Sequence, residues 1–367
     1  MLKLFLAALP FVASLSWFSA SDTHLGHDPV TPNGTIVTSY EKNVWAIEEM
    51  NTLATPSCRG NCAWPAALGG GPVLPPLGVT ISGDLVDNGG NPGTVVNGCA
   101  QWSNFTALYG LTGTDGLLKY KCYEGRGNHD TPNTTNAMPH DCATVPSRAI
   151  VARNKLRAAD PAFAIDGTSS LSGLHYSWTW SIDDTCRVHF VQLNLLPGHT
   201  CGTPANPTHE GTFPCTDGWV WPEDSMGFLQ SDLAANDKPG TVMIAIHHYG
   251  FDGFSNSWYN SEQREELFNT LSKYKTLAVL VGHTHGAAVY AYNGTAEGAW
   301  EKGGEGGYVH IINAPATQKE DGQHNPLPSE FMVLEATMLG GGVGSLRVAQ
   351  RVGSGWGTVM GQTNFTC

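Results

Sequence analysis

The chain has 367 residues, of which 19 are Lys or Arg and 32 are Asp or Glu, giving a formal net charge of −13. This acidic balance argues against a nucleic-acid-binding face, because such faces need clustered basic residues. The 44 glycines and 22 prolines are typical of a chain rich in loops and strands. No linker or low-complexity segment divides the sequence, so we expect one domain over residues 17–367, with a β-rich C-terminal region from about residue 308.

Residues 1–16 have the pattern of a secretory signal peptide. Lys3 supplies a positive charge, and a short apolar stretch follows it before the first small residues. A proline interrupts this stretch, which is also short for a membrane span; an uncleaved anchor is the alternative. Because Asp22 needs residues 15–20 as a strand before it, we expect cleavage at or before Ser16. The mature chain is therefore expected to be secreted and to contain no transmembrane span.

The nine cysteines favour disulfides in an oxidising compartment, because none has the Cys-x-x-Cys spacing of a zinc site. Cys58 with Cys62, and Cys201 with Cys215, are plausible local pairs. Nine is an odd number, so one thiol is free or intermolecular, and we expect it to be that of Cys367. Five N-glycosylation sequons agree with secretion; they begin at Asn33, Asn104, Asn133, Asn293 and Asn364.

Helical and strand-like segments alternate along the chain, which predicts an α/β fold. The expected helices are residues 41–53, 146–158, 226–236 and 261–274, the last with Ser261 as its N-cap. The expected strands are residues 79–82, 117–123, 188–193, 242–246, 277–281, 308–312, 331–336 and 346–352. Two of them, 242–246 and 277–281, are continuously apolar, as in central strands covered on both faces. The long connections 54–78 and 194–225 are expected to form the rim of a substrate cleft.

Five short polar blocks each follow a strand-like run. They are Asp22-Thr23-His24, Gly83-Asp84-Leu85-Val86-Asp87, Gly127-Asn128-His129-Asp130, His247-His248 and Gly282-His283-Thr284-His285. Their carboxylates, carboxamide and imidazoles are hard or borderline ligands for divalent metals. An α/β sheet presents its ligand site at the carboxyl ends of its strands. Each block alone is common, but the five in this order predict a metal centre.

The roles of individual residues follow from their chemistry. Asp84 could bridge two ions through its two oxygens, and the glycine before it lets the backbone come close to them. In Gly-His-Thr-His, alternate side chains lie on one face of an extended segment, so His283 and His285 can both face the cluster. Paired histidines such as His247 and His248 at the end of a buried strand are more often structural, but these fall in the order of the blocks.

This ordered set of blocks resembles the signature of the calcineurin-like metallophosphoesterase superfamily, over about residues 17–315. The resemblance implies two mixed β-sheets packed as a sandwich and flanked by helices, with two divalent metal ions (Zn, Mn, Fe or Mg) at the strand ends. It implies a first metal site made of Asp22, His24, Asp84 and His285. It implies a second site, sharing the same bridging carboxylate, made of Asp84, Asn128, His247 and His283. Of the paired histidines, His247 is preferred because the family ligand directly follows the strand.

The resemblance also implies an activity: hydrolysis of phosphate mono- or diesters by a hydroxide held between the two metals. His129 would contact the phosphoryl oxygen and protonate the leaving group, and the neighbouring Asp130 could orient or charge it. Asp87 stands where purple acid phosphatases carry a tyrosine, which argues against an iron–tyrosinate centre.

Two other functions are compatible with the sequence. One is a secreted phosphodiesterase acting on phospholipids or sphingolipids, which an apolar cleft rim from residues 54–78 would favour. The other is a binding module that retains the fold without turnover. The intact set of ligand positions counts against the second function, and the sequence does not specify an oligomeric state.

Overall fold

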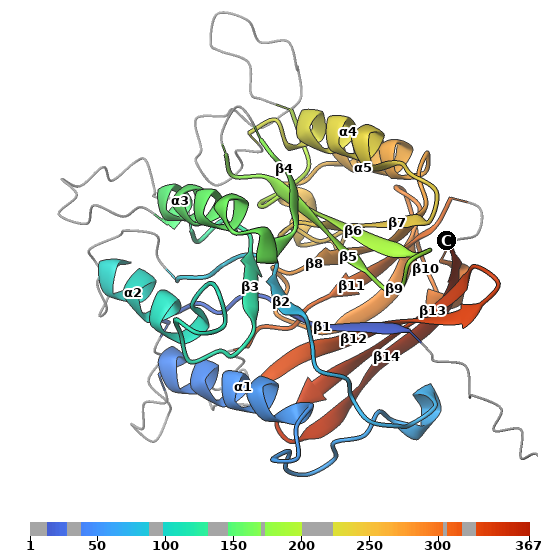
Figure 1. Cartoon of the computed structure of the whole chain (residues 1–367). Coiled ribbons are helices and arrows are strands. Elements are labelled where there is room, and N and C mark those ends of the chain that lie inside the picture. Colours follow the sequence, from blue (N-terminus) through green and yellow to red (C-terminus); the bar gives the residue numbers. More distant parts are fainter. Residues whose placement is uncertain are drawn as a thin grey trace, which may run out of the picture.

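Two mixed β-sheets pack face to face in the computed structural model, and helices cover their outer faces (Figure 1). The structure describes residues 13–27, 38–87, 98–130, 146–169, 173–199, 223–303, 307–317 and 328–367. The predicted α/β sandwich of two mixed sheets flanked by helices is confirmed.

The first sheet has six strands in the order β14-β13-β12-β1-β2-β3. Their bounds are β1 Ser14–Ala20, β2 Gly78–Ile81, β3 Lys121–Glu124, β12 Glu330–Gly340, β13 Val343–Val352 and β14 Gly355–Thr366. Strands β1, β2 and β3 run parallel, whereas β12 pairs antiparallel to β1. The carboxyl ends of β1, β2 and β3 therefore meet at one edge of this sheet.

The second sheet has eight strands in the order β10-β9-β11-β8-β7-β6-β5-β4. Their bounds are β4 Ile165–Thr168, β5 Tyr176–Ser181, β6 Arg187–Gln192, β7 Thr241–Ile246, β8 Thr276–Val281, β9 Ala288–Tyr292, β10 Glu297–Gly298 and β11 Val309–Asn313. Strands β6, β7, β8 and β11 run parallel. All six residues of β7 are buried, as its continuous apolar run predicts.

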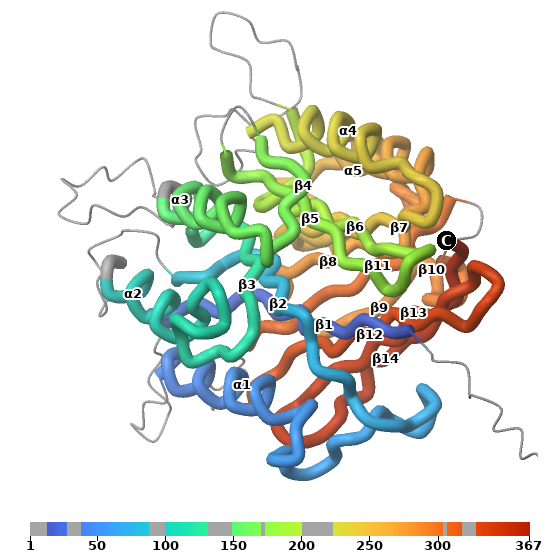
Figure 2. The backbone as a smooth tube through the Cα atoms, viewed as in Figure 1, coloured from blue at the N-terminus to red at the C-terminus, as the bar shows by residue number. Residues whose placement is uncertain are grey.

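Three apolar layers hold the sheets and helices together. The layer between the sheets contains Trp17, Trp178 and Phe190, of which the last two stack at 5.0 Å between ring centroids. A second layer lies under α1 (Ser39–Leu53), α2 (Gly98–Tyr109) and α3 (Pro146–Ala159), and a third under α4 (Ser225–Asn236) and α5 (Ser261–Leu271). The backbone tube shows these helices on opposite outer sides of the paired sheets (Figure 2).

Short 3₁₀ turns complete the described elements: η1 Ala66–Leu68, η3 Pro161–Phe163, η5 Ser255–Ser257 and η6 Trp300–Lys302. Helix α5 begins with a capping box in which the Asn260 side chain accepts a hydrogen bond from the backbone of Gln263. Asn260, not the predicted Ser261, is thus the N-cap residue.

The expected strand at 117–123 is shorter than predicted. Leu117 and Leu118 donate their backbone N–H groups to Ala107 and Leu108 at the end of α2, so the strand starts only at Lys121. Helix α2 and strand β5 were not predicted. In β5, the alternating aromatic and polar residues form a buried strand that pairs with β6.

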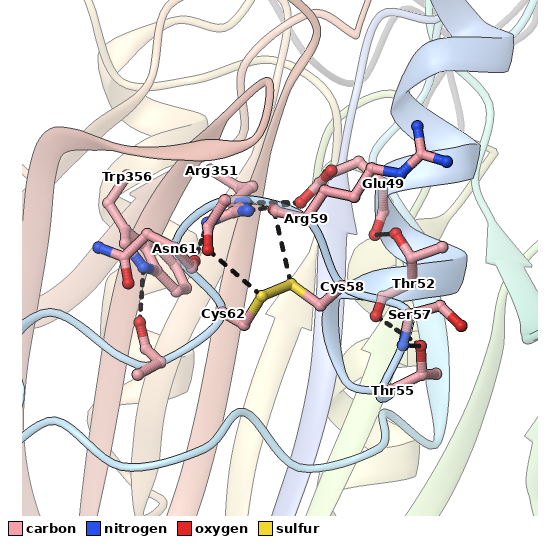
Figure 3. Close-up of a disulfide and its surroundings, with 12 residues drawn as sticks. Glu49, Thr52, Thr55, Ser57, Cys58, Arg59, Asn61, Cys62, Arg351 and Trp356 are labelled. Carbon is pink, nitrogen blue, oxygen red and sulfur yellow. Dashed lines mark hydrogen bonds and ion pairs between the residues drawn. A yellow bond between two sulfur atoms is a disulfide. The ribbon is translucent and has the colours of Figure 1, made fainter.

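The segment expected to form a cleft rim, residues 54–78, instead covers β13 and β14 (Figure 3). Arg351 donates to the carbonyl of Asn61 at 2.6 Å, and the Trp356 indole stacks on that of Trp64 at 5.5 Å. Because this segment leads into the amino end of β2, it lies away from the carboxyl edge. The apolar rim that would favour a lipid substrate is therefore not formed by these residues. Most of the other expected rim, 194–225, lies outside the described residues.

The disulfides confirm one predicted pair and overturn one prediction. Cys58 and Cys62 are bonded, as expected. Cys367 is not left over, because it is bonded to Cys186 at the start of β6. Cys122 is a free thiol, and it is buried. Cys201 and Cys215 lie outside the described residues.

The predicted leader overlaps the first strand. Residues 1–12 lie outside the described residues, but Ser14, Leu15 and Ser16 belong to β1 and pair with β12. Cleavage after Ser16 would remove these three residues from the strand. None of the helices that the structure describes is both long and apolar enough to cross a bilayer.

Glu124, at the end of β3, is fully buried between two arginines of α3. It accepts from Arg153 Nε at 2.6 Å and also pairs with Arg157. Burial raises the pKa of the Glu124 carboxyl, but the charges of Arg153 and Arg157 outweigh burial and lower it to about 2. This ion pair attaches α3 to the sheet beside the polar edge.

We therefore expect Glu124→Gln to lower the free energy of unfolding by about 3–5 kcal/mol at pH 7, because two buried guanidinium groups lose their charge partner. Since the pKa is lowered on folding, this contribution is complete above the unfolded value of 4.5 and declines as the pH falls towards 2. Urea denaturation at several pH values measures it. Exposed Glu48→Gln is the control, and an equal loss in both variants, or one independent of pH, would contradict the assignment.

Candidate metal centre

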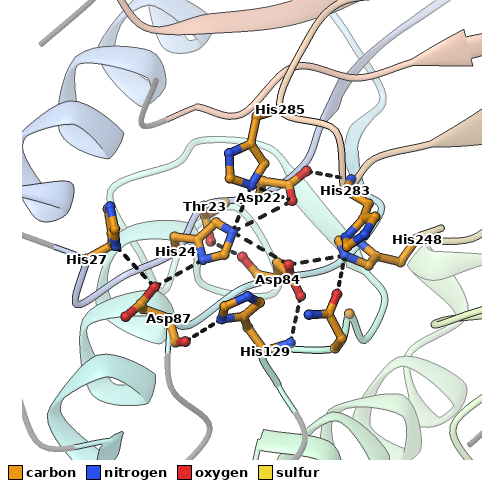
Figure 4. A network of polar contacts seen from close by, with 12 residues as sticks. Asp22, Thr23, His24, His27, Asp84, Asp87, His129, His248, His283 and His285 are labelled. Atoms are coloured by element: carbon orange, nitrogen blue, oxygen red, sulfur yellow. Dashed lines mark hydrogen bonds and ion pairs between the residues drawn. The ribbon is translucent and has the colours of Figure 1, made fainter. Parts of the chain in front are cut away.

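The five polar blocks come together where the carboxyl edges of the two sheets meet (Figure 4). Three blocks follow β1, β2 and β3 of the first sheet, and two follow β7 and β8 of the second. Backbone hydrogen bonds connect the blocks: Asp22 N donates to Gly83 O at 2.9 Å, and Gly282 N donates to His248 O at 2.9 Å. Residues as distant in the sequence as Asp22 and His285 thus form one polar cluster.

One half of the cluster surrounds the Asp22 carboxylate. Its Oδ1 lies 3.7 Å from His24 Nε2 and 3.4 Å from His285 Nε2. Its Oδ2 accepts from the backbone N of His283 at 3.0 Å. The ligand atoms of Asp22, His24 and His285 all lie within 4.8 Å of one another, close enough to bind one ion.

The other half surrounds Asp84. Its Oδ2 lies 3.1 Å from His248 Nε2 and 3.5 Å from His24 Nε2, so the carboxylate stands between the two halves. His248 Nε2 is also 3.1 Å from Asn128 Oδ1. Asp84, His248 and His283 form a second group with ligand atoms within 4.8 Å of one another. The carboxylate expected to bridge two ions is thus the one shared by both halves.

The structure brings His248 to the cluster and does not bring His247 there. Successive residues of a strand point to opposite faces, and β7 presents Ile244 and Ile246 to the layer between the sheets. His248 continues that face, whereas His247 packs under the helices against Phe251 and Tyr259. Burial lowers the pKa of His247 to about 3, so its ring is a neutral core group. The sequence-based preference for His247 is therefore replaced by His248.

His129 lies at the mouth of the cluster. Its backbone N donates to Asp84 Oδ1 at 2.9 Å, its Nδ1 contacts the carbonyl of Asp87, and its ring lies 4.6 Å from that of His24. A contact of Nδ1 with a carbonyl means that Nδ1 carries the proton. In the neutral ring, Nε2 is then the nitrogen without a proton.

Asp130 connects two blocks through the backbone. Its Oδ1 accepts from the N–H groups of Leu85 and Val86 at 2.9 and 3.1 Å, and its Oδ2 accepts from that of Gly127 at 2.8 Å. Burial raises the pKa of Asp130 to about 7, and the charge of Asp84 acts in the same direction. These contacts hold the loops in place; the sequence-based expectation was that Asp130 acts on His129.

Asp87 is a residue whose role sequence reasoning missed. Its Oδ1 lies 3.3 Å from His24 Nδ1 and 3.3 Å from His27 Nδ1. A carboxylate that pairs with one ring nitrogen of a histidine orients the other nitrogen towards a ligand. Asp87 thus turns His24 Nε2 towards Asp22 and Asp84. Asp87 follows Asp84 by three residues, and this spacing could have predicted that its carboxylate lies beside the cluster.

The electrostatics of the cluster balance two buried carboxylates against imidazoles. Burial raises the pKa of Asp84, but the charges of His248 and His129 outweigh it and hold this pKa below its usual range. Burial and the charge of His248 lower the pKa of His283 to about 4. At neutral pH the His283 ring is therefore neutral, as a metal ligand must be.

Backbone strain is concentrated in the same blocks. Nine described residues other than glycine have a positive φ, and five belong to the cluster: Asp22, His24, Asp84, His283 and His285. Left-handed backbone is uncommon outside glycine and costs about 1–3 kcal/mol per residue. At these five residues, the left-handed backbone turns the side chain from the sheet normal towards the centre of the cluster.

The cluster forms the floor of an open cavity of about 710 Å³. Asp84, Asn128, His129, His283 and His285 contribute to its lining. The remaining lining residues are Thr284 and three aromatic residues from the segment after β7, namely Tyr249, Phe254 and Trp258.

The residues present fit a pair of divalent cations. Asp22 Oδ1, His248 Nδ1 and His283 Nε2 are buried and have no hydrogen-bond partner among the described residues. Buried polar atoms without partners are rare, because each costs about 1–3 kcal/mol. A cation near Asp22 Oδ1 and His283 Nε2 would remove this cost. Carboxylate, carboxamide and imidazole ligands suit zinc, manganese or iron.

No protein-family model matches the sequence, and no curated protein matches it. Among solved structures, the chain is similar to GAP50, the anchor in the inner membrane complex of Plasmodium, with a TM-score of 0.50 and 11% identity. That match covers 96% of this chain and 89% of GAP50.

The chain is also similar to the purple acid phosphatase PPD1 from yellow lupin seeds, with a TM-score of 0.50 and 13% identity over 97% of this chain and 54% of that one. The calcineurin-like phosphoesterase YfkN from Bacillus subtilis matches with a TM-score of 0.40 and 13% identity, over 97% of this chain and 91% of that one. This chain has the calcineurin-like metallophosphoesterase fold.

In this metallophosphoesterase fold, Gly127 stands where a side chain would collide with the Asp84 carboxylate. A Cβ at Gly127 would overlap Asp84 Oδ1 and lie too close to the Asp84 backbone, whereas a Cβ at Gly286 would have its nearest neighbour at 3.9 Å. We expect Gly127→Ala to lower the free energy of unfolding by about 1–3 kcal/mol through overpacking. Gly286→Ala should stay within about 0.5 kcal/mol of the parent. Chemical denaturation of both variants measures this, and equal stabilities would argue against a tight approach at Gly127.

Proposed function

We propose that this chain is a secreted phosphoesterase that uses two divalent metal ions to hydrolyse phosphate mono- or diesters. The observation that carries the proposal is the convergence of two buried carboxylates and several imidazoles, some with unpartnered donor atoms, on one open cavity. The fold, shared with a purple acid phosphatase, supports it.

The proposed ligands divide into two sets that share Asp84. The first set is Asp22, His24, Asp84 and His285; the second is Asp84, Asn128, His248 and His283. When bound, such a pair of ions supplies Lewis acidity for phosphoryl oxygens and lowers the pKa of water towards about 7. Two charges of +2 against two carboxylates leave a net positive centre, which attracts a phosphate despite the acidic chain.

His129 is the proposed proton donor. In the hydrolysis, the oxygen of water bonds to phosphorus, the bond between phosphorus and the ester oxygen breaks, and the departing alcohol needs one proton. His129 lines the cavity, and its Nδ1 is engaged by the Asp87 carbonyl. In the imidazolium form the second ring proton sits on Nε2; transfer of that proton to the alcohol oxygen leaves the neutral imidazole, a contribution typically worth about 10²–10⁴ in rate.

Secretion is part of the proposal. The apolar N-terminal stretch, the sequons and the two disulfides of the described residues are consistent with an oxidising compartment. The Cys186–Cys367 bond closes a loop of 181 residues, which a reducing cytoplasm would open.

A binding role without turnover is the second candidate. The similarity to GAP50, described as an anchor, favours it. His129 and both proposed ligand sets are present in this chain. This favours catalysis, because an anchor needs neither. Metal content together with phosphatase activity separates the two functions.

The choice between the paired histidines can be tested by matched variants. We expect His248→Asn to lose about one of two bound metals, because His248 Nε2 contacts both Asp84 and Asn128. His247→Asn should keep both metals and lose stability, because its ring packs against Phe251 and Tyr259. Elemental analysis of the purified proteins gives the metal count. Metal loss in the His247 variant alone would restore the original sequence-based preference.

A second pair of variants separates the catalytic role from the binding of metal. Asp84→Asn should reduce hydrolysis of 4-nitrophenyl phosphate and bis(4-nitrophenyl) phosphate to background, because one carboxylate serves both ligand sets. His129→Ala should retain the metals and lose about 10²–10⁴ in kcat. Turnover is followed by nitrophenolate absorbance, with metal content measured on the same samples. Full activity in both variants would exclude the proposed chemistry.

A further inference from the structure

The wall of the cavity opposite the carboxylates consists of aromatic rings. Tyr249 stacks on Trp258 at 5.8 Å with 13° between ring planes, and Phe254 meets Trp258 edge to face at 5.0 Å. Phe254 also lies parallel to the His283 ring, at 5.0 Å and 18°. The ring of Phe254 therefore lies directly beside one of the proposed metal ligands.

Phe254 is unusually exposed for a ring in such a position. Its exposed fraction is 60%, and of the strongly exposed large apolar side chains among the described residues it is the one that lines the cavity. One face of the ring covers His283, so the exposed area belongs to the opposite face and the edges. That open face can stack against a second planar ring.

The segment that carries Phe254 is held rigidly. Asp252 Oδ1 accepts from the backbone N–H groups of Phe254 and Ser255 at 2.8 and 2.9 Å. The buried Arg264 of α5 donates to the carbonyl of Phe251 at 2.9 Å. A loop fixed in this way loses little conformational entropy when a ligand binds, so the ring position is prepared in advance.

The charges of the cavity restrict what the rings can accept. No Lys or Arg is among the residues that line it in the described part of the chain. Among those described residues, the groups that could carry a positive charge are the imidazoles of the metal cluster. The group that lies over the wall should therefore be uncharged.

We propose that the aromatic wall formed by Tyr249, Phe254 and Trp258 is a substrate subsite for a planar, uncharged aromatic ring on the alcohol part of a phosphate ester, such as a nucleoside base or an arylmethyl group. This inference rests on the proposed function, since the phosphate would lie on the metal side of His283.

Binding of non-hydrolysable phosphonates tests the subsite apart from turnover. Benzylphosphonate and cyclohexylmethylphosphonate have the same charge and similar size, but only the first has a planar aromatic ring. On the metal-loaded protein we expect benzylphosphonate to bind about five- to tenfold more tightly, the gain typical of ring stacking. Phosphocholine is the third ligand, because its cation would also favour aromatic rings. Calorimetric titration gives the three Kd values.

Variants at Phe254 identify the ring that is responsible. Phe254→Leu keeps an apolar side chain and should remove the preference for benzylphosphonate. The Kd of cyclohexylmethylphosphonate should stay within about twofold of its value for the unchanged protein. Phe254→Tyr should retain the preference because it restores an aromatic face. Leu339→Ala, at an equally exposed residue of β12, is the control and should change neither Kd.

The outcomes distinguish this inference from the proposed function. Equal affinity for the two phosphonates, equal loss of both in Phe254→Leu, or tighter binding of phosphocholine would overturn the subsite. Hydrolysis of benzyl phosphate is measured separately. A clear benzyl preference without turnover of the mono- or diester would leave the subsite standing and refute the proposed catalysis.

Discussion

The burial of two carboxylates at the meeting edge of two sheets is the constraint on which the rest of the structure depends. Asp22 and Asp84 are 0% and 1% exposed. Removing such charges from water costs several kcal/mol per ion unless other groups compensate. The compensation comes from both sheets: His24 from the strand next to Asp84, and His248 and His285 from the opposite sheet. Neither sheet alone can hold these charges, so the packing of the sandwich and the formation of the cluster require each other.

Backbone strain in the cluster follows from the same constraint. A strand end delivers its side chain along the sheet normal, but the shared centre lies beyond the strand ends. Left-handed φ values at Asp22, Asp84 and His283 turn the side chains inward. This costs stability, and the costs are offset by a core of packed aromatic rings such as Trp178 on Phe190. The packing of the layer between the sheets therefore offsets the strain of the cluster. On the proposed function, contacts with a substrate are left to residues outside that layer.

The sequence predicted what is determined locally. Three features depend mainly on residues that are neighbours in the sequence: the apolar runs of β7 and β8, the polar blocks at the strand ends and the Cys58–Cys62 loop. Each of them is present in the structure. What the sequence could not predict depends on partners distant in the chain. Either His247 or His248 could have faced the cluster, because alternation fixes their opposition but not which face of β7 meets the other sheet. Cys367 pairs with Cys186 only because β14 ends beside the start of β6, and residues 54–78 cover β13 and β14 although their composition suggested a cleft rim.

The two sheets contribute different chemistry to the centre. The six-stranded sheet supplies both carboxylates, the carboxamide and His129, whereas the eight-stranded sheet supplies His248, His283 and His285 and the aromatic wall. On the proposed assignment, the charge of the metals is therefore balanced mainly from one side. On the same proposal, the organic part of the substrate would be contacted from the other side. The segment between β7 and α5 carries Phe254 and Trp258, but its only part in the cluster is His248 at its start. On the proposed function, changes in this segment beyond His248 would alter which alcohol is accepted while the carboxylates, and with them the reaction, stay the same.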